Sequence, residues 1–101
     1  MKNTEKTPAV LDITSLDVYV LLSMIIDILS EQAWQYMGLR VKPGTDKVEK
    51  DFQRARVAID CIVFLTNKVT PQLDDSGKKQ LQKLIADLQI NFARVATQEQ
   101  M

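Results

Sequence analysis

The sequence predicts an all-α protein built from three antiparallel helices in an up-down-up helical bundle. Three long stretches carry apolar residues at helical spacing, and each measures about 30–35 Å at 1.5 Å per residue. Short connections containing Pro43-Gly44 and Pro71 separate them, so neighbouring helices are expected to run antiparallel. The chain has 101 residues, of which 46% are hydrophobic, and this suits one folded domain. We expect self-association to complete the bundle.

The first helix is expected to begin at Thr14 or Ser15 and to end at Gly38. Thr14 can cap its N-terminus, and Asp17 adds a favourable charge to the first turn. Gly38 can adopt the left-handed conformation that ends a helix. The apolar arc of this helix covers roughly half its circumference, which exceeds the ~100° stripe of an ordinary surface helix.

The second helix is expected to run from Thr45 or Asp46 to Thr70, where Pro71 stops it. Asp46 and Glu49 have the spacing of a capping box. One face repeats apolar or small residues in a heptad pattern, namely Val48, Phe52, Ala55, Ile59, Ile62, Thr66 and Val69. Its second half, residues 57–65, is apolar nearly all round.

The third helix is expected to begin at Asp74 or Asp75 and to fray after Ala96. Its apolar stripe consists of Leu81, Leu84, Ile85, Leu88, Phe92 and Val95. The predicted organisation is therefore a flexible N-terminal arm at 1–13, a three-helix domain at 14–96 and a frayed C-terminus at 97–101.

The composition argues against most catalytic chemistry. The chain has no His and one Cys, so we expect no metal site, no cofactor and no catalytic residues. Asp27, Asp60 and Asp87 are single carboxylates among apolar residues, and each is expected to mark the solvent-facing edge of its helix. The alternative is an enzyme in which the fold brings two of them together for acid–base chemistry. Cys61 lies in the apolar segment 57–65 and is expected to be an inert core thiol.

Three blocks of sequence resemble one protein family. The first contains Gln32-Ala33 and Met37-Gly38, with Pro43 after it, and the third contains Leu88-Gln89 and Phe92. The second block matches at Asp51, Phe52, Ala55, Arg56, Ile59 and Asp60. Together they resemble the small bacterial family called domain of unknown function eighteen-forty-four, over roughly residues 18–95. The segment before the third helix departs from the family pattern, because it has no acidic pair after its cap. The resemblance implies a helical fold and brings no known activity.

We expect a non-enzymatic subunit that self-associates, as a homodimer, or binds a protein partner that the sequence does not identify. Equal numbers of acidic and basic residues, 13 each, leave little long-range repulsion between copies. The candidate interface consists of surplus apolar residues on the first two helices: Val20, Met24, Ile28, Trp34, Val63 and Phe64. Internal packing of Trp34 is the alternative to an exposed role. Cover of part of this surface by Val10, Leu11 and Ile13 of the N-terminal arm, within one chain, is the alternative to self-association.

A second hypothesis places nucleic acid on the basic segment Arg40–Arg56, whose basic residues outnumber its acidic ones. A solvated helix face is the simpler interpretation of that segment, since no phosphate-binding loop accompanies it. The sequence contains no pattern of a signal peptide or a membrane span, so we expect a cytoplasmic protein without a membrane partner.

Overall fold

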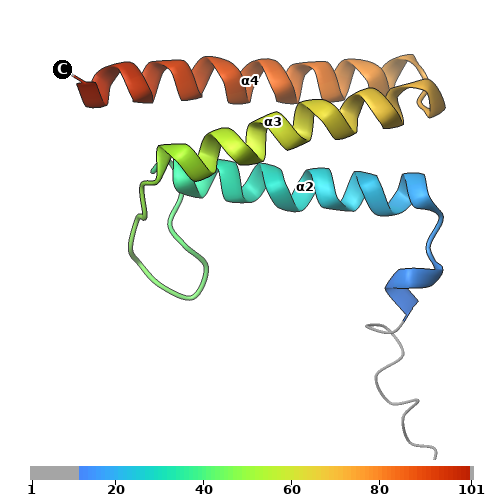
Figure 1. Ribbon diagram of the computed structural model, residues 1–101, viewed down its shortest axis with the longest axis horizontal. Helices are drawn as coiled ribbons and strands as arrows, with labels where there is room; N and C mark the ends of the chain where they lie inside the picture. The colour runs from blue at the N-terminus through green and yellow to red at the C-terminus, as the bar shows by residue number, and fades with distance from the viewer. Residues whose placement is uncertain (1–11, 101) are drawn as a thin grey trace, which may run out of the picture.

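The computed structural model describes residues 12–100 and shows an all-α fold of three long helices running up, down and up (Figure 1). They are α2 at Val18–Tyr36, α3 at Phe52–Val69 and α4 at Asp75–Gln100. Two short 3-10 turns, η2 at Asp12–Ser15 and η3 at Thr70–Gln72, precede α2 and follow α3. The predicted fold class is confirmed.

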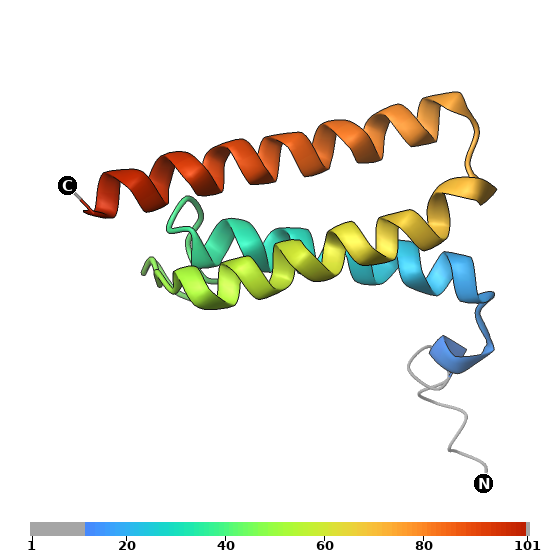
Figure 2. The same ribbon diagram turned by 45° about the horizontal axis from the view of Figure 1, so that its top comes forward.

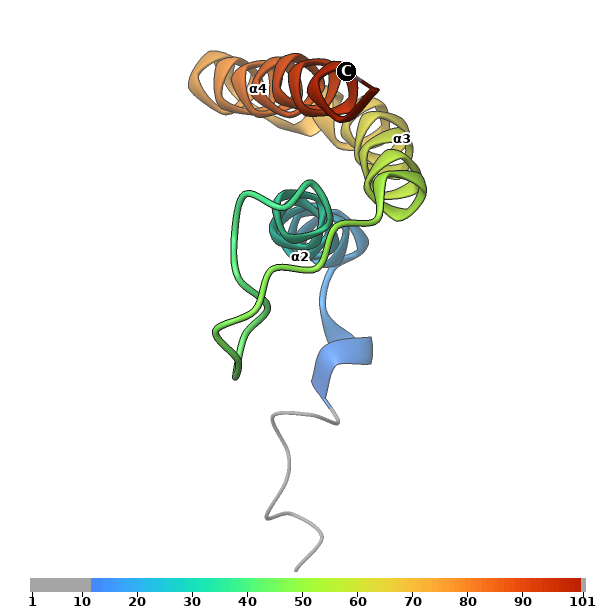
Figure 3. The same ribbon diagram turned by 90° about the vertical axis from the view of Figure 1, so that its left-hand side faces the viewer.

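The central helix of the arrangement is α3. It packs along α2 over most of its length and also contacts α4, whereas α2 and α4 barely touch each other. Viewed end on, the three helices form an arc with α3 in the middle (Figure 3), and α4 is set apart from the α2–α3 pair (Figure 2). The fold is therefore a tight helical hairpin with a third helix laid along one side.

The core lies where α2 and α3 approach each other. Ala33 of α2 and Ala55 of α3 are fully buried, as are Ile26 and Ile62. Small side chains at such positions let two helices pack closely. The heptad face predicted for the second helix is largely confirmed, since Ala55, Ile59, Ile62, Thr66 and Val69 are all buried. Leu88 and Val95 are the buried apolar residues of α4 within the described part of the chain.

The first long helix begins later than predicted. α2 starts at Val18 because Asp17 caps it, its side chain accepting a 2.9 Å hydrogen bond from the Tyr19 N–H. Thr14 and Ser15 belong instead to the separate turn η2. Of the flexible arm expected at 1–13, only Asp12 and Ile13 fall within the described residues.

The predicted start of the second helix at Thr45 or Asp46 is wrong. Asp51 is the cap of α3 and accepts a 3.0 Å hydrogen bond from the Arg54 N–H. The Asp51 N–H donates to the Tyr36 carbonyl at 2.8 Å, which fixes the entry of α3 beside the end of α2. Residues around Thr45 form a turn, closed by the Lys42 N–H donating to the Lys47 carbonyl at 3.0 Å. Asp46 and Glu49 therefore form no capping box.

The third helix continues further than predicted. Asp74 caps α4, its carboxylate accepting a 2.8 Å hydrogen bond from the Gly77 N–H. Its helical conformation continues past Ala96, where the sequence predicts its end, to Gln100. Glu99 in its last turn contacts the Lys50 ammonium at 3.5 Å, which ties the end of α4 to the segment that precedes α3.

Gly38 ends α2 in a conformation that favours glycine. Its φ is +83°, its N–H donates to the Gln35 carbonyl, and the Leu39 N–H donates to the Trp34 carbonyl. These two bonds are those of a Schellman motif. A Cβ on Gly38 would lie 2.7 Å from Cγ of Lys50.

Gly38→Ala is expected to lower the free energy of unfolding by about 1–2 kcal/mol through left-handed backbone strain, with an added steric cost at Lys50. Gly44→Ala is the matched control, because Gly44 has a similar φ of +82° but open space around its Cα. Urea denaturation should show a larger loss for Gly38→Ala. Equal losses would mean that Lys50 moves aside without cost.

Candidate interaction surface

An apolar face spans α2 and α3 on the side that α4 leaves uncovered. The apolar face, as we define it, consists of Leu21, Ile25, Ile28 and Leu29 from α2 and Val57, Cys61, Phe64 and Leu65 from α3. A groove of about 410 Å³ runs through it, lined by Ile25, Leu29, Asp60, Cys61, Phe64 and Leu65 and by no residue of α4. The two helices thus present one continuous surface rather than two separate stripes.

The side chains of the apolar face are unusually exposed for their size. Ile28 is 58% exposed, Val57 57% and Phe64 61%. On α2 the exposed or half-buried residues Leu21, Ile25 and Ile28 follow a four-three spacing, and so do Val57, Cys61 and Phe64 on α3. This spacing is the one with which a helix packs against another helix. Contiguous exposed apolar surface of this kind marks interaction sites in soluble proteins.

The structure divides the six candidate interface residues into two groups. Val20, Met24, Ile28 and Phe64 are exposed. Ile28 and Phe64 belong to the apolar face, and Met24 and Val20 extend the exposed apolar surface along α2, one and two turns before Ile28. Trp34 is half-buried and packs against the core, with the Arg40 guanidinium 5.9 Å from its ring. Val63 is half-buried and points about 100° round the helix from Phe64.

The sequence prediction for Cys61 is wrong. The residue was expected inside the core, but its side chain is exposed and forms part of the apolar groove. The reason is the phase of the helix: burial of Ile59 and Ile62 against the neighbouring helices turns Cys61 outward. In a single chain the thiol is exposed, and a partner on the apolar face would cover it.

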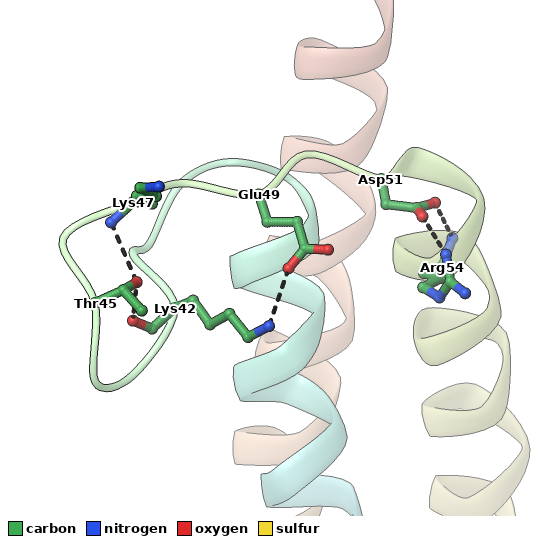
Figure 4. A network of polar contacts seen from close by, with 6 residues as sticks. All are labelled: Lys42, Thr45, Lys47, Glu49, Asp51 and Arg54. Carbon is green, nitrogen blue, oxygen red and sulfur yellow. Dashed lines mark hydrogen bonds and ion pairs between the residues drawn. The ribbon is translucent and has the colours of Figure 1, made fainter.

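The basic segment Arg40–Arg56 is largely neutralised within the chain. Lys42 lies 3.5 Å from Glu49, Lys50 lies 3.5 Å from Glu99, and Arg54 lies 2.5 Å from Asp51 (Figure 4 shows the first and third pairs). Arg40 forms a further pair with Glu31 of α2. Among the six basic residues of the segment, only Lys47 and Arg56 have no acidic partner in the described chain.

The Asp51–Arg54 contact at the start of α3 shifts both groups. The Arg54 backbone N–H, and then its guanidinium, hold the pKa of Asp51 below its usual value. The same carboxylate raises the pKa of Arg54. Because the pKa of Asp51 is lower in the folded state, its stabilising effect is present above the pKa of the unfolded chain and is lost as the pH falls through the folded value.

The three isolated carboxylates do not converge on one site. Asp87 pairs with the Lys83 ammonium at 2.9 Å on the same helix. Asp27 lines a shallow hollow with Leu81 of α4, whereas Asp60 lines the apolar groove beside Cys61. Within residues 12–100, no three His, Cys, Asp or Glu side chains lie close enough together to hold a metal ion. None of the helices in that range combines the length and hydropathy of a membrane span.

Comparison with known proteins gives one match. The model of a family described as a domain of unknown function, DUF1844, matches residues 19–94. This range begins one residue after the first residue of α2 and ends within α4, so it covers nearly all of α2, all of α3 and most of α4, with the segments between them. Searches of curated proteins and of solved structures find no significant match.

Proposed function

The chain belongs to the DUF1844 family, whose description assigns no function, and we propose that it acts as a non-enzymatic subunit that self-associates through its apolar face. The observation that carries this proposal is the continuous apolar surface of α2 and α3, with Ile28, Val57 and Phe64 each more than half exposed. Burial of such side chains is worth about 1.5–3 kcal/mol each, which favours their removal from water.

A second copy of the chain is the occupant that this surface fits. The α2–α3 pair is an antiparallel hairpin with one uncovered apolar side, and two such hairpins placed face to face make a four-helix bundle. Closed two-fold pairing is the commonest way in which soluble proteins bury a patch of this kind. A formal net charge of zero adds little repulsion between copies.

Light scattering coupled to size exclusion tests self-association directly. The wild type is expected to have the mass of two chains at micromolar concentration, and Ile28→Glu is expected to have the mass of one. Ile90→Glu is the matched control, because Ile90 is 65% exposed but lies on α4, away from the apolar face. It should remain dimeric. A wild-type mass of one chain at every concentration would refute the proposal, as would a fully dimeric Ile28→Glu whose helical content is unchanged.

Cys61 provides a second measurement on the unmodified protein. Self-association would cover the thiol, which is exposed in the single chain. We expect its reaction with a thiol reagent to slow as the protein concentration rises, and to be fast at every concentration in Ile28→Glu. The same fast rate in both proteins at every concentration would show that the apolar face stays open.

Nucleic-acid association through Arg40–Arg56 has weaker support, because four of the six basic residues already face an acidic partner. Measuring the affinity of the protein for a labelled oligonucleotide at several salt concentrations separates the two hypotheses. A phosphate-driven complex loses affinity steeply as salt rises. Burial of the apolar face does not depend on phosphate, so the dimer mass should persist without nucleic acid.

A further inference from the structure

We propose that the two copies pack with α2 of each chain against α3 of the other, so that the two-fold axis runs parallel to the helices. This inference rests on the proposed self-association and specifies its geometry. Two hairpins can meet face to face in two ways: like helices pair if the axis crosses the helices, and unlike helices pair if it runs along them. The charges on the two helices distinguish these arrangements.

The helices α2 and α3 carry opposite charge. Between Val18 and Tyr36, α2 contains the acids Asp27 and Glu31 and no basic residue. Between Phe52 and Val69, α3 contains the bases Arg54, Arg56 and Lys68 against the single acid Asp60, while its cap Asp51 pairs with Arg54. Pairing α2 with α2 would place acids beside acids, and pairing α3 with α3 would place bases beside bases. Juxtaposed like charges disfavour an interface, so the charges select the unlike pairing.

The charged residues also flank the apolar stripes at matching distances. On α2, Asp17 precedes Leu21 by four residues and Glu31 follows Ile28 by three. On α3, Arg54 precedes Val57 by three residues and Lys68 follows Phe64 by four. Each flanking pair is fourteen residues apart, about 21 Å along a helix. An α2 laid antiparallel along α3 therefore brings an acidic end to each basic end.

These flanking groups remain available at the surface. Glu31 and Arg54 have partners within the chain, yet their side chains stay 51% and 68% exposed. The Lys68 ammonium lies 5.2 Å from the centre of the exposed Phe64 ring, at the edge of the apolar face. Rim charges of this kind govern orientation and the rate of association more than affinity.

The apolar groove fixes which residues meet across the interface. Within one chain the groove brings Ile25 and Leu29 beside Cys61 and Leu65, so these residues lie at one level along the bundle. Rotation about an axis parallel to the helices does not change the position of a residue along them, so these residues lie at the same level in the second copy. Cys61 of one chain then faces the Ile25 to Ile28 turn of the other. An axis across the helices would instead bring the two Cys61 residues together, because Cys61 is the middle residue of its stripe.

Crosslinking with a short bismaleimide, followed by denaturing electrophoresis, tests this arrangement in three full-length proteins. The wild type carries Cys61 alone, Ile28→Cys carries two thiols, and Ile28→Cys with Cys61→Ser carries the new thiol alone. We expect a covalent dimer only in Ile28→Cys, with mass spectrometry identifying a link between positions 28 and 61 of different chains. Ile25→Cys serves as a second variant at the same level. Because Ile25 and Cys61 also line one groove within a chain, only links found in the electrophoretic band of two chains count.

Light scattering on each sample distinguishes a failure of the proposed self-association from a failure of the proposed pairing of α2 with α3. A monomeric wild type overturns both self-association and its geometry. A dimer that crosslinks through Cys61 in the wild type shows α3 against α3, and a dimer that crosslinks through position 28 alone shows α2 against α2. Either result overturns only the unlike pairing. A dimer in which neither Ile28→Cys nor Ile25→Cys links to Cys61 also contradicts it.

Discussion

Replacing Ile62 by alanine is expected to lower the free energy of unfolding by about 2–5 kcal/mol, the range for removing a large apolar side chain from a packed core. Ile62 has no exposed surface and lies mid-helix on the buried face of α3, which packs against α2. Small domains have about 5–15 kcal/mol of stability in total, so the variant would lose a large share of it. Urea denaturation at a fixed protein concentration measures the change.

Ile90→Ala is the control for this substitution, because the chemistry is the same and Ile90 is 65% exposed. Its effect should stay within about 0.5 kcal/mol of zero, as is usual for surface positions. A loss below about 1 kcal/mol for Ile62→Ala would mean that the α2–α3 contact is not the main source of stability.

Leu88→Ala is expected to release α4 while the α2–α3 hairpin stays folded. Leu88 has no exposed surface, and it and Val95 are the buried apolar side chains that α4 contributes in the described chain. Because α4 packs on α3 and barely touches α2, the removal of Leu88 costs α4 a large part of its attachment. The local free energy of opening of α4 should fall by about 2–5 kcal/mol.

Hydrogen exchange resolved by peptide measures this release helix by helix. We expect faster exchange in residues 77–100 of Leu88→Ala and little change in α2 and in the first half of α3. Ile90→Ala again serves as the control, now on the same helix. If exchange accelerates equally in all three helices, the chain unfolds as one cooperative unit and the separate character of α4 is refuted.

The number of helices, their order and the buried face of α3 could be predicted from the sequence because they depend on local patterns. Pro71 and Gly38 mark helix ends, and the heptad of Ala55, Ile59 and Ile62 shows which side of α3 is buried. These signals are local, because a helix end depends on a few adjacent residues and the residues of a buried face recur every three or four positions. Self-association was also expected from the surplus of apolar residues, and it remains a prediction.

Helix starts were less predictable, because the sequence offers several acidic residues that can cap a helix. Asp46 and Asp51 are both suitable caps for the second helix. The choice of Asp51 depends on a bond to a distant residue, since its N–H donates to the Tyr36 carbonyl at the end of α2. No local pattern records that contact.

The sequence by itself determined that the chain forms three amphipathic helices with more apolar surface than a three-helix bundle needs. The tertiary structure alone decided which part of that surface remains open. The heptad through Ile59 and Ile62 shows one buried side of α3, but residues 57–65 are apolar nearly all round, so their sequence does not show whether the side with Cys61 and Phe64 is covered as well. The position of α4 settles this, because it leaves one side of the α2–α3 pair uncovered, so Cys61 and Phe64 stay exposed. Trp34, by contrast, packs against the core. Packing between distant segments fixes such outcomes, and periodicity within one helix cannot encode them.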